Sequence, residues 1–287
     1  MTSHQTGSHG MVVGIDPDRN WRLALAWAAD EAQRRRLPLR LVLAVPHQHD
    51  THHVDDTPGQ TALRQAGSDR LEQACNWVRD RHPEVSVTGD LLGGFPVHVL
   101  GGAAREARMI VLGSRHLSRT AEFFSAGSLV VPITAQAHCP VVVVGDAEHI
   151  SQQPPYLVAG IDGSASATAA LAFAFDEADI RGAALRVVCV WQPPLVMLDD
   201  EEVALRAQRA LLSEATAGLS EKYPDVHVTH EVLTGHPVEE LARAAEHALA
   251  VVVGRRGSGG YTGMRIGSVV HGLLHRAHCP VITVPTG

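Results

Sequence analysis

The sequence predicts an α/β protein made of two tandem copies of one domain, each a doubly wound, parallel, five-stranded sheet. In both halves, short apolar runs rich in Val, Ile and Leu alternate with longer segments of helical period, which is typical of a parallel sheet covered on both faces. The second half also repeats the first in the same order. With 287 residues, 45% of them hydrophobic, the chain has the length and apolar content of about two domains.

The repeat is clearest at the two ends of each half. Residues 12–16 (VVGID) match residues 158–162 (VAGID), and the segment HCPV occurs at 138–141 and again at 278–281. The offset falls only from 146 (Asp16 to Asp162) to 140 (Cys139 to Cys279), so the length differences are small and fit loops. We expect a first domain over residues 1–148, a linker over 149–155 and a second domain over 156–287.

In the second half, a first strand is expected to end at Gly160. Periodicity then predicts the following elements in chain order: helix 165–178, strand 185–191, helix 201–222, strand 226–233, helix 238–248, strand 249–253, helix 268–276 and strand 281–284. The last strands of the halves, 141–144 and 281–284, are so apolar that we expect their edges to pair about a pseudo-twofold axis. A homodimer of the whole chain is left open.

Composition excludes several classes of protein. A net charge of -7 with 19% charged residues argues against disorder and against a nucleic-acid partner. No apolar stretch approaches the roughly 18 residues that a membrane helix needs, and residues 1–10 are unlike a signal peptide, so we expect a cytoplasmic protein without membrane association. Lys222 is the only lysine and is not part of a GK[ST] sequence, which argues against a Walker P-loop.

Residues 254–268 predict a phosphate-binding loop, because they follow the pattern GxxG-x9-GS between a strand and a helix. Glycines let backbone N–H groups approach phosphate oxygens, and the helix N-terminus adds partial positive charge. Ser268 supplies a hydroxyl, and Arg255, Arg256 and Arg265 supply positive charge. The alternative is a glycine-rich turn without a ligand, which we disfavour because α/β sheets bind ligands beyond the carboxyl ends of their strands.

With residues 160–164 (GIDGS) and 279–284 (CPVITV), this loop resembles the tandem two-domain members of the universal stress protein family over nearly the whole chain. The resemblance implies a Rossmann-like fold of the adenine-nucleotide-hydrolase type and membership of the ATP-binding branch, with ATP and Mg²⁺ as ligands. It also implies that Asp162 contacts adenine or ribose, that Val190 contacts adenine through its backbone, and that the glycine loop holds the phosphates. The binding residues expected in the second half are Gly160, Asp162, Val190, Gly254, Arg255, Arg256, Gly257, Ser258, Gly267, Ser268 and Val269.

The first half departs from this pattern. His116 replaces the second glycine, ten residues instead of nine precede the next glycine, and Pro17 follows Asp16. A side chain at position 116 would crowd a phosphate, so the sequence leaves open whether this site is weakened, empty or occupied. Its corresponding residues are Gly14, Asp16, Val45, Gly113, Ser114, Gly127 and Ser128.

The expected function is that of an ATP-binding stress-response sensor or regulator that acts through an unidentified protein partner. Because no water-activating base or catalytic lysine is evident, we assign no catalytic residue and expect slow or no ATP hydrolysis. The alternatives are an ATP-cleaving or adenylating enzyme, whose SGGxDS motif is missing, and a nucleotide-free interaction module. Histidines and aspartates between residues 47 and 56 are suitable metal ligands, but the second half has no counterpart and we favour a solvated loop without metal.

Overall fold

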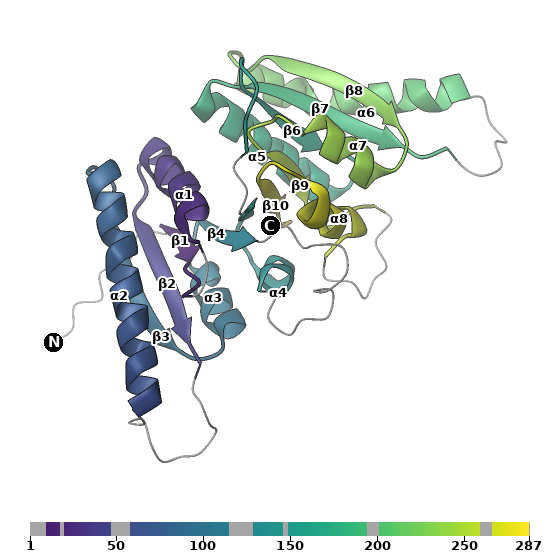
Figure 1. Ribbon diagram of the computed structural model, residues 1–287. Coiled ribbons are helices and arrows are strands. Elements are labelled where there is room, and N and C mark those ends of the chain that lie inside the picture. The colour runs from purple at the N-terminus through teal and green to yellow at the C-terminus, as the bar shows by residue number, and fades with distance from the viewer. Residues whose placement is uncertain are drawn as a thin grey trace. The chain divides into compact units, whose positions relative to one another are not determined.

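The computed structural model describes residues 10–17, 20–46, 58–114, 129–145, 149–193, 201–258 and 266–286. The chain forms two compact units that correspond to the two halves of the sequence (Figure 1). The described residues contain no helix that is both long and apolar enough to cross a membrane. The histidine-rich segment 47–56 lies outside the described residues, so its expected role as a solvated loop stays a prediction.

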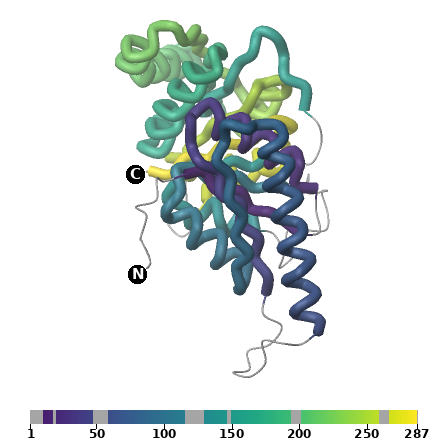
Figure 2. Tube along the Cα trace, turned by 90° about the vertical axis from the view of Figure 1, so that its left-hand side faces the viewer, coloured from purple at the N-terminus to yellow at the C-terminus, as the bar shows by residue number. Residues whose placement is uncertain are grey.

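The first unit is a parallel sheet with strand order β3-β2-β1-β4-β5. Figure 2 shows its longest helix, α2, running alongside the strands of this unit. Its elements in chain order are β1 (Met11–Gly14), α1 (Arg22–Arg35), β2 (Leu39–Val45), α2 (Pro58–Arg81), β3 (Val87–Gly93), α3 (Pro96–Arg105), β4 (Met109–Ser114), α4 (Val130–Gln136) and β5 (Val141–Gly145).

The second unit repeats this topology with the strand order β8-β7-β6-β9-β10, again all parallel. Its elements in chain order are β6 (Tyr156–Gly160), α5 (Ala165–Arg181), β7 (Ala184–Trp191), α6 (Glu201–Lys222), β8 (Val228–Thr234), α7 (Pro237–Ala244), β9 (Val251–Gly254), α8 (Ser268–Arg276) and β10 (Val281–Val284).

Helices cover both faces of each sheet, as the doubly wound prediction requires. In the second unit α5 packs with α6 and α7 packs with α8, and α1 with α2 and α3 with α4 make the equivalent pairs in the first unit (Figure 1). The chain therefore changes faces after β3 and after β8, and the strand order reverses between β1 and β4 and between β6 and β9. Such a reversal leaves a crevice beyond the carboxyl ends of the strands.

Burial of the strands follows their apolar content. Every residue of β10 is buried, and so are the first three of both β1 and β9. The edge strands β3 and β8 are only partly buried. Each is joined to its neighbour by an equivalent ion pair, from Arg40 Nε to Asp90 Oδ2 at 2.6 Å and from Arg186 Nε to Glu231 Oε1 at 2.8 Å. Charged side chains on an edge strand also discourage pairing with other chains.

The predicted boundaries are confirmed for α6, α8 and β10, whereas α7 is shorter than predicted. It ends at Ala244 rather than at residue 248, because the Ala244 carbonyl accepts hydrogen bonds from Tyr156 Oη at 3.3 Å and Arg186 Nη1 at 3.0 Å. These donors satisfy a carbonyl that would otherwise lack a partner at a helix end. The pairing of the last strands about a pseudo-twofold axis stays a prediction.

The segment expected to be a linker contacts the second unit at two points. The carbonyl of Ala248 lies 2.7 Å from His149 Nε2, and the Gln152 N–H donates to the His247 carbonyl at 2.9 Å. Residues 149–155 are therefore attached to the body of the second unit along part of their length.

A pair of equivalent core substitutions tests whether the units are independent. Leu25 in α1 and Leu171 in α5 are both 0% exposed. We predict that Leu25→Ala and Leu171→Ala each lower the free energy of unfolding of their own unit by about 2–5 kcal/mol, since each leaves a core cavity. Hydrogen exchange during urea titration should show lost protection only in the strands of the substituted unit. If Leu25→Ala exposes β6–β10 as much as β1–β5, the units unfold together.

Candidate functional site

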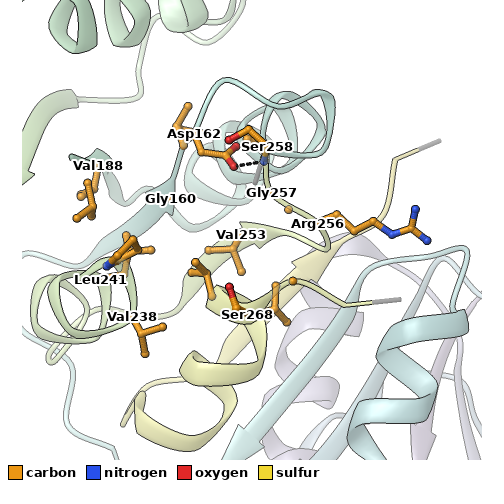
Figure 3. A pocket seen from close by; sticks show the side chains of 18 of the residues that line it. Gly160, Asp162, Val188, Val238, Leu241, Val253, Arg256, Gly257, Ser258 and Ser268 are labelled. Atoms are coloured by element: carbon orange, nitrogen blue, oxygen red, sulfur yellow. Dashed lines mark hydrogen bonds between the residues drawn. The ribbon is translucent and has the colours of Figure 1, made fainter. Parts of the chain in front are cut away.

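The second unit contains a cavity of about 440 Å³ at the carboxyl edge of its sheet (Figure 3). Its walls come from the ends of β6, β7 and β9 and from the beginnings of α5, α7 and α8. The lining residues are Gly160, Ile161, Asp162, Ala167, Val188, Val190, Gln192, His236, Pro237, Val238, Leu241, Val253, Gly254, Arg256, Gly257, Ser258, Gly267, Ser268, Val269 and Val270.

Strand pairing creates this cavity. In the parallel ladders, Gly160 at the end of β6 is paired with Val253 of β9 on one side and with Val188 of β7 on the other. The three strands therefore end next to one another although their residues are far apart in sequence. Because the chain leaves β6 and β9 toward opposite faces of the sheet, the space between the two ends stays open to a ligand.

One part of the cavity is apolar. Val188, Val238, Leu241 and Val253 surround it, and Figure 3 shows these side chains grouped around the end of β6. Gly160 permits this arrangement, since a Cβ at its position would lie only 3.0 Å from both Leu241 Cδ1 and Val253 Cγ1. An apolar surface of this kind suits the face of an aromatic ring.

The opposite part is formed by the loop that follows β9, whose first residues are tied to neighbouring elements. The Arg255 N–H donates to the Val284 carbonyl at 2.9 Å, and the Arg256 N–H donates to Ser166 Oγ at 3.3 Å. Gly254 is required here, because a Cβ at its position would lie 2.5 Å from the carbonyl carbon of Ser166. The close approach of β9 to the first turn of α5 therefore fixes where the loop begins.

The Asp162 carboxylate joins the turn after β6 to this loop. Its Oδ1 accepts a hydrogen bond from the Ser164 N–H at 3.1 Å, and its Oδ2 accepts one from the Ser258 N–H at 2.7 Å (Figure 3). Partial burial by itself raises the pKa of Asp162, but the hydrogen bonds from Ser164 and Ser258 outweigh burial, so the pKa lies below its ordinary value. The side chain is therefore an anion at neutral pH.

The N-terminus of α8 closes the polar part of the cavity. Gly267 is its N-cap residue, with no side chain to accept from the first N–H groups of the helix, and Ser268, Val269 and Val270 line the cavity. The first N–H groups of a helix lack intrahelical acceptors and carry partial positive charge, so they bind anions. Figure 3 shows the Ser268 hydroxyl at the same wall.

The two arginines of the loop differ in position. Arg256 lines the cavity, although its guanidinium extends away from Asp162 in Figure 3. Arg255 is not among the lining residues, and burial, together with the charge of Arg256, lowers its pKa. Arg265 lies outside the described residues. Of the two described arginines, only Arg256 therefore lines the cavity.

Apart from Arg255, every residue proposed for the second site lines this one cavity. Sequence reasoning missed the apolar wall, although signals for it exist. Val188 lies two positions before Val190 and so faces the same side of β7. Residues 236–238 echo residues 95–97 in the internal repeat, with a proline at the first position of the following helix in both copies.

In the first unit, the ends of β1 and β4 are also adjacent, because Gly14 is paired with Leu112. Asp16 follows β1, and Gly113 and Ser114 end β4, whereas Gly127 and Ser128 lie outside the described residues. Trp21 occupies the position equivalent to Ala167 of the second cavity and packs edge-on against Trp77, with ring centroids 6.0 Å apart. The two units therefore differ in the size of the side chain at this position as well as in loop sequence.

The strand register also changes one equivalence. The Val45 carbonyl accepts a hydrogen bond from the Gly94 N–H at 3.0 Å, and the Trp191 carbonyl accepts the equivalent bond from the Gly235 N–H at 3.1 Å. Val45 therefore corresponds to Trp191, so the counterpart of Val190 is Ala44, the residue before Val45. Val45 lines a different cavity of about 440 Å³, formed by the end of β2, Pro17 and α2.

The close contact at Gly254 gives a test of how the loop is anchored. We predict that Gly254→Ala lowers the free energy of unfolding of the second unit by about 1–3 kcal/mol, because the new methyl group collides with the backbone of α5. Gly218→Ala in α6 is the control: no atom lies within 4 Å of its added Cβ, and alanine favours a helix interior. Urea titration should separate the two variants, and equal stabilities would contradict the anchoring.

Comparison with known proteins gives the family. The sequence model of the universal stress protein family matches residues 9–145 and again residues 157–285. Universal stress protein Rv2005c of Mycobacterium tuberculosis is 34% identical over 288 residues, which cover 96% of each chain. Universal stress protein Rv2623 of the same organism is 34% identical over 292 residues, which cover 98% of this chain and 97% of the relative.

The fold agrees with this family match. The crystal structure of a universal stress protein from Archaeoglobus fulgidus superposes with a TM-score of 0.74 at 18% identity and covers 97% of this chain and 96% of that one. The sequence matches extend over both halves. The chain belongs to the universal stress protein family and contains two of its domains in tandem.

Proposed function

We propose that the chain is a stress-response regulator whose second unit binds ATP. The observation that carries the proposal is the cavity itself, in which an apolar surface and the N–H groups at the start of α8 face one space. Adenine nucleotides combine an apolar ring with phosphates, so they match both parts. A volume of about 440 Å³ lies within the range of small-molecule sites.

In this proposal, the adenine ring lies against Val188, Val238 and Leu241, and the backbone of Val190 reads its edge. The phosphates accept hydrogen bonds from backbone N–H groups of the glycine loop and of the first turn of α8. Mg²⁺, a hard cation with oxygen ligands, would use phosphate oxygens and the Ser268 hydroxyl. Each of these residues lines the cavity.

The same residues support binding rather than rapid catalysis. Lys222 is fully exposed at the end of α6, away from the cavity lining. Asp162, a carboxylate of the cavity wall, has a lowered pKa and is occupied by two backbone N–H groups, which makes it a poor general base. We therefore propose that nucleotide occupancy changes the affinity of the protein for a protein partner. We also propose that the protein acts in the cytoplasm.

We propose that the first unit binds nucleotide more weakly, if it binds it at all. Trp21 replaces the small Ala167, and Pro17 replaces Gly163, whose φ of +77° shapes the turn after β6. Proline holds φ near about −65°, so the turn after β1 has a different backbone path. An enzyme that cleaves ATP and a nucleotide-free interaction module are the competing functions, and the two measurements below distinguish them.

The binding experiment is a thermal shift of the full chain with Mg-ATP. At a free concentration about 100 times the Kd, the ligand should add about 2.7 kcal/mol to the stability of the unit that binds it. Gly267→Val should remove most of the shift, because a Cβ at 267 lies 3.5 Å from the Gly257 N, beside the N–H groups proposed to hold phosphate. Gly127→Val, at the matching position of the first half, should remove less. No shift at millimolar Mg-ATP contradicts the proposal.

The turnover experiment measures phosphate release under multiple-turnover conditions at saturating Mg-ATP. We predict a rate well below about 1 per second, the lower end of ordinary enzyme turnover. A rate at or above that value would favour the enzyme. A thermal shift without turnover would exclude the nucleotide-free module and an enzyme that hydrolyses ATP without a second substrate.

A further inference from the structure

The contact between Asp162 and the loop gives a specific reason for the second glycine of the GxxG sequence. A Cβ added at Gly257 would lie 2.6 Å from Asp162 Oδ2, and among the described residues, the two chain neighbours aside, the only other atom within 4 Å of it is the Cγ of the same carboxylate. Gly257 does not have a positive φ, so its backbone conformation does not require glycine. The Asp162 carboxylate therefore constrains this position already in the protein without a ligand.

The same carboxylate orients the next residue. The Ser258 N–H donates to Oδ2 at 2.7 Å, while Oδ1 is held by the Ser164 N–H at 3.1 Å. The turn that carries Asp162 is itself tied to the loop, since Ser164 Oγ donates to the Arg256 carbonyl at 3.4 Å. Both carboxylate oxygens therefore accept hydrogen bonds from backbone N–H groups. Oδ1 accepts within the turn after β6, and Oδ2 accepts from the loop after β9.

We propose that Asp162 is a positioning residue that fixes the phosphate loop, so that affinity for the phosphate part of a ligand depends on it more than affinity for the nucleoside part. This rests on the proposed nucleotide site and assigns Asp162 a role different from the ribose or adenine contact that the family resemblance implies. A glycine-rich segment has many accessible backbone conformations. Fixing its beginning before the ligand arrives lowers the entropic cost of binding.

The negative charge of Asp162 makes the proposal testable. A carboxylate beside a polyphosphate repels it, so neutralising Asp162 would by itself raise the affinity for phosphate-bearing ligands. If Asp162 fixes the loop, neutralising it lowers that affinity. If Asp162 binds ribose, the loss falls on nucleosides and not on inorganic polyphosphate.

The first experiment measures Kd by calorimetry for the full chain and Asp162→Asn with Mg-ATP, inorganic tripolyphosphate and adenosine. We expect affinity for ATP and tripolyphosphate to fall about tenfold, as the loss of a charge-assisted hydrogen bond predicts, and affinity for adenosine to change less than about twofold. Asp225→Asn, at an exposed aspartate that precedes β8 and is not among the residues lining the cavity, is the control and should leave these values unchanged. A higher affinity for tripolyphosphate, a loss for adenosine with tripolyphosphate unchanged, or equal losses for all three ligands overturns the proposal.

The second experiment needs no ligand. In the wild-type chain, Gly257→Ala should increase the amide exchange rate of Ser258 about tenfold, because the methyl group displaces the carboxylate. In an Asp162→Ala background, where exchange is already fast, the same substitution should have no further effect, since within the described part of the chain the carboxylate is the group that the new methyl would meet. Additive effects, or a Ser258 amide unaffected by Asp162→Ala, overturn the proposal. Because this cycle is measured without nucleotide, it stands even if the ATP proposal fails.

Discussion

The parallel pairing of β6 with β9 is the constraint on which the candidate site depends. Through it, Val158 is paired with Val251 and Gly160 with Val253, so two chain segments more than 90 positions apart end side by side. The aspartate that follows β6 can then reach the loop that follows β9. The first turn of α5 must also pass close to Gly254, where only the absence of a side chain leaves room for Ser166. The site is a consequence of the ladder and of these close approaches.

The two units show that framework and site respond separately to sequence change. Both keep a fully buried glutamate in the first helix, Glu31 or Glu177, each paired with an arginine four residues later. An unpaired charge at such a position would be strongly destabilising, which gives selection a reason to retain both partners. At the carboxyl edge the two units differ, and Trp21 stands in place of Ala167. The fold tolerates this change because the Trp21 side chain is itself buried, where it packs against Trp77.

The sequence predicted the fold, and the place of the glycine-rich segment between β9 and α8, because these depend on local patterns. An apolar run predicted β10, helical period and length predicted α6, and the internal repeat predicted the two units. The apolar wall was missed because Leu241 and Val238 read as ordinary core residues of an amphipathic helix, and only the reversal of strand order directs them into a cavity. The bond from Ser258 to Asp162 joins residues 96 positions apart, and no spacing rule predicts such a contact.

The nature of the donors explains how affinity can change without loss of the fold. The proposed phosphate contacts are mainly backbone N–H groups, which every residue but proline possesses, so side-chain replacement removes few of them directly. Affinity then depends on the backbone path, and the path depends on a few residues that anchor it, such as Gly254 and Ser166. A substitution at an anchor weakens every phosphate contact together, while the core of the unit stays packed. A tandem protein can in this way retain one strong site beside a diverged one.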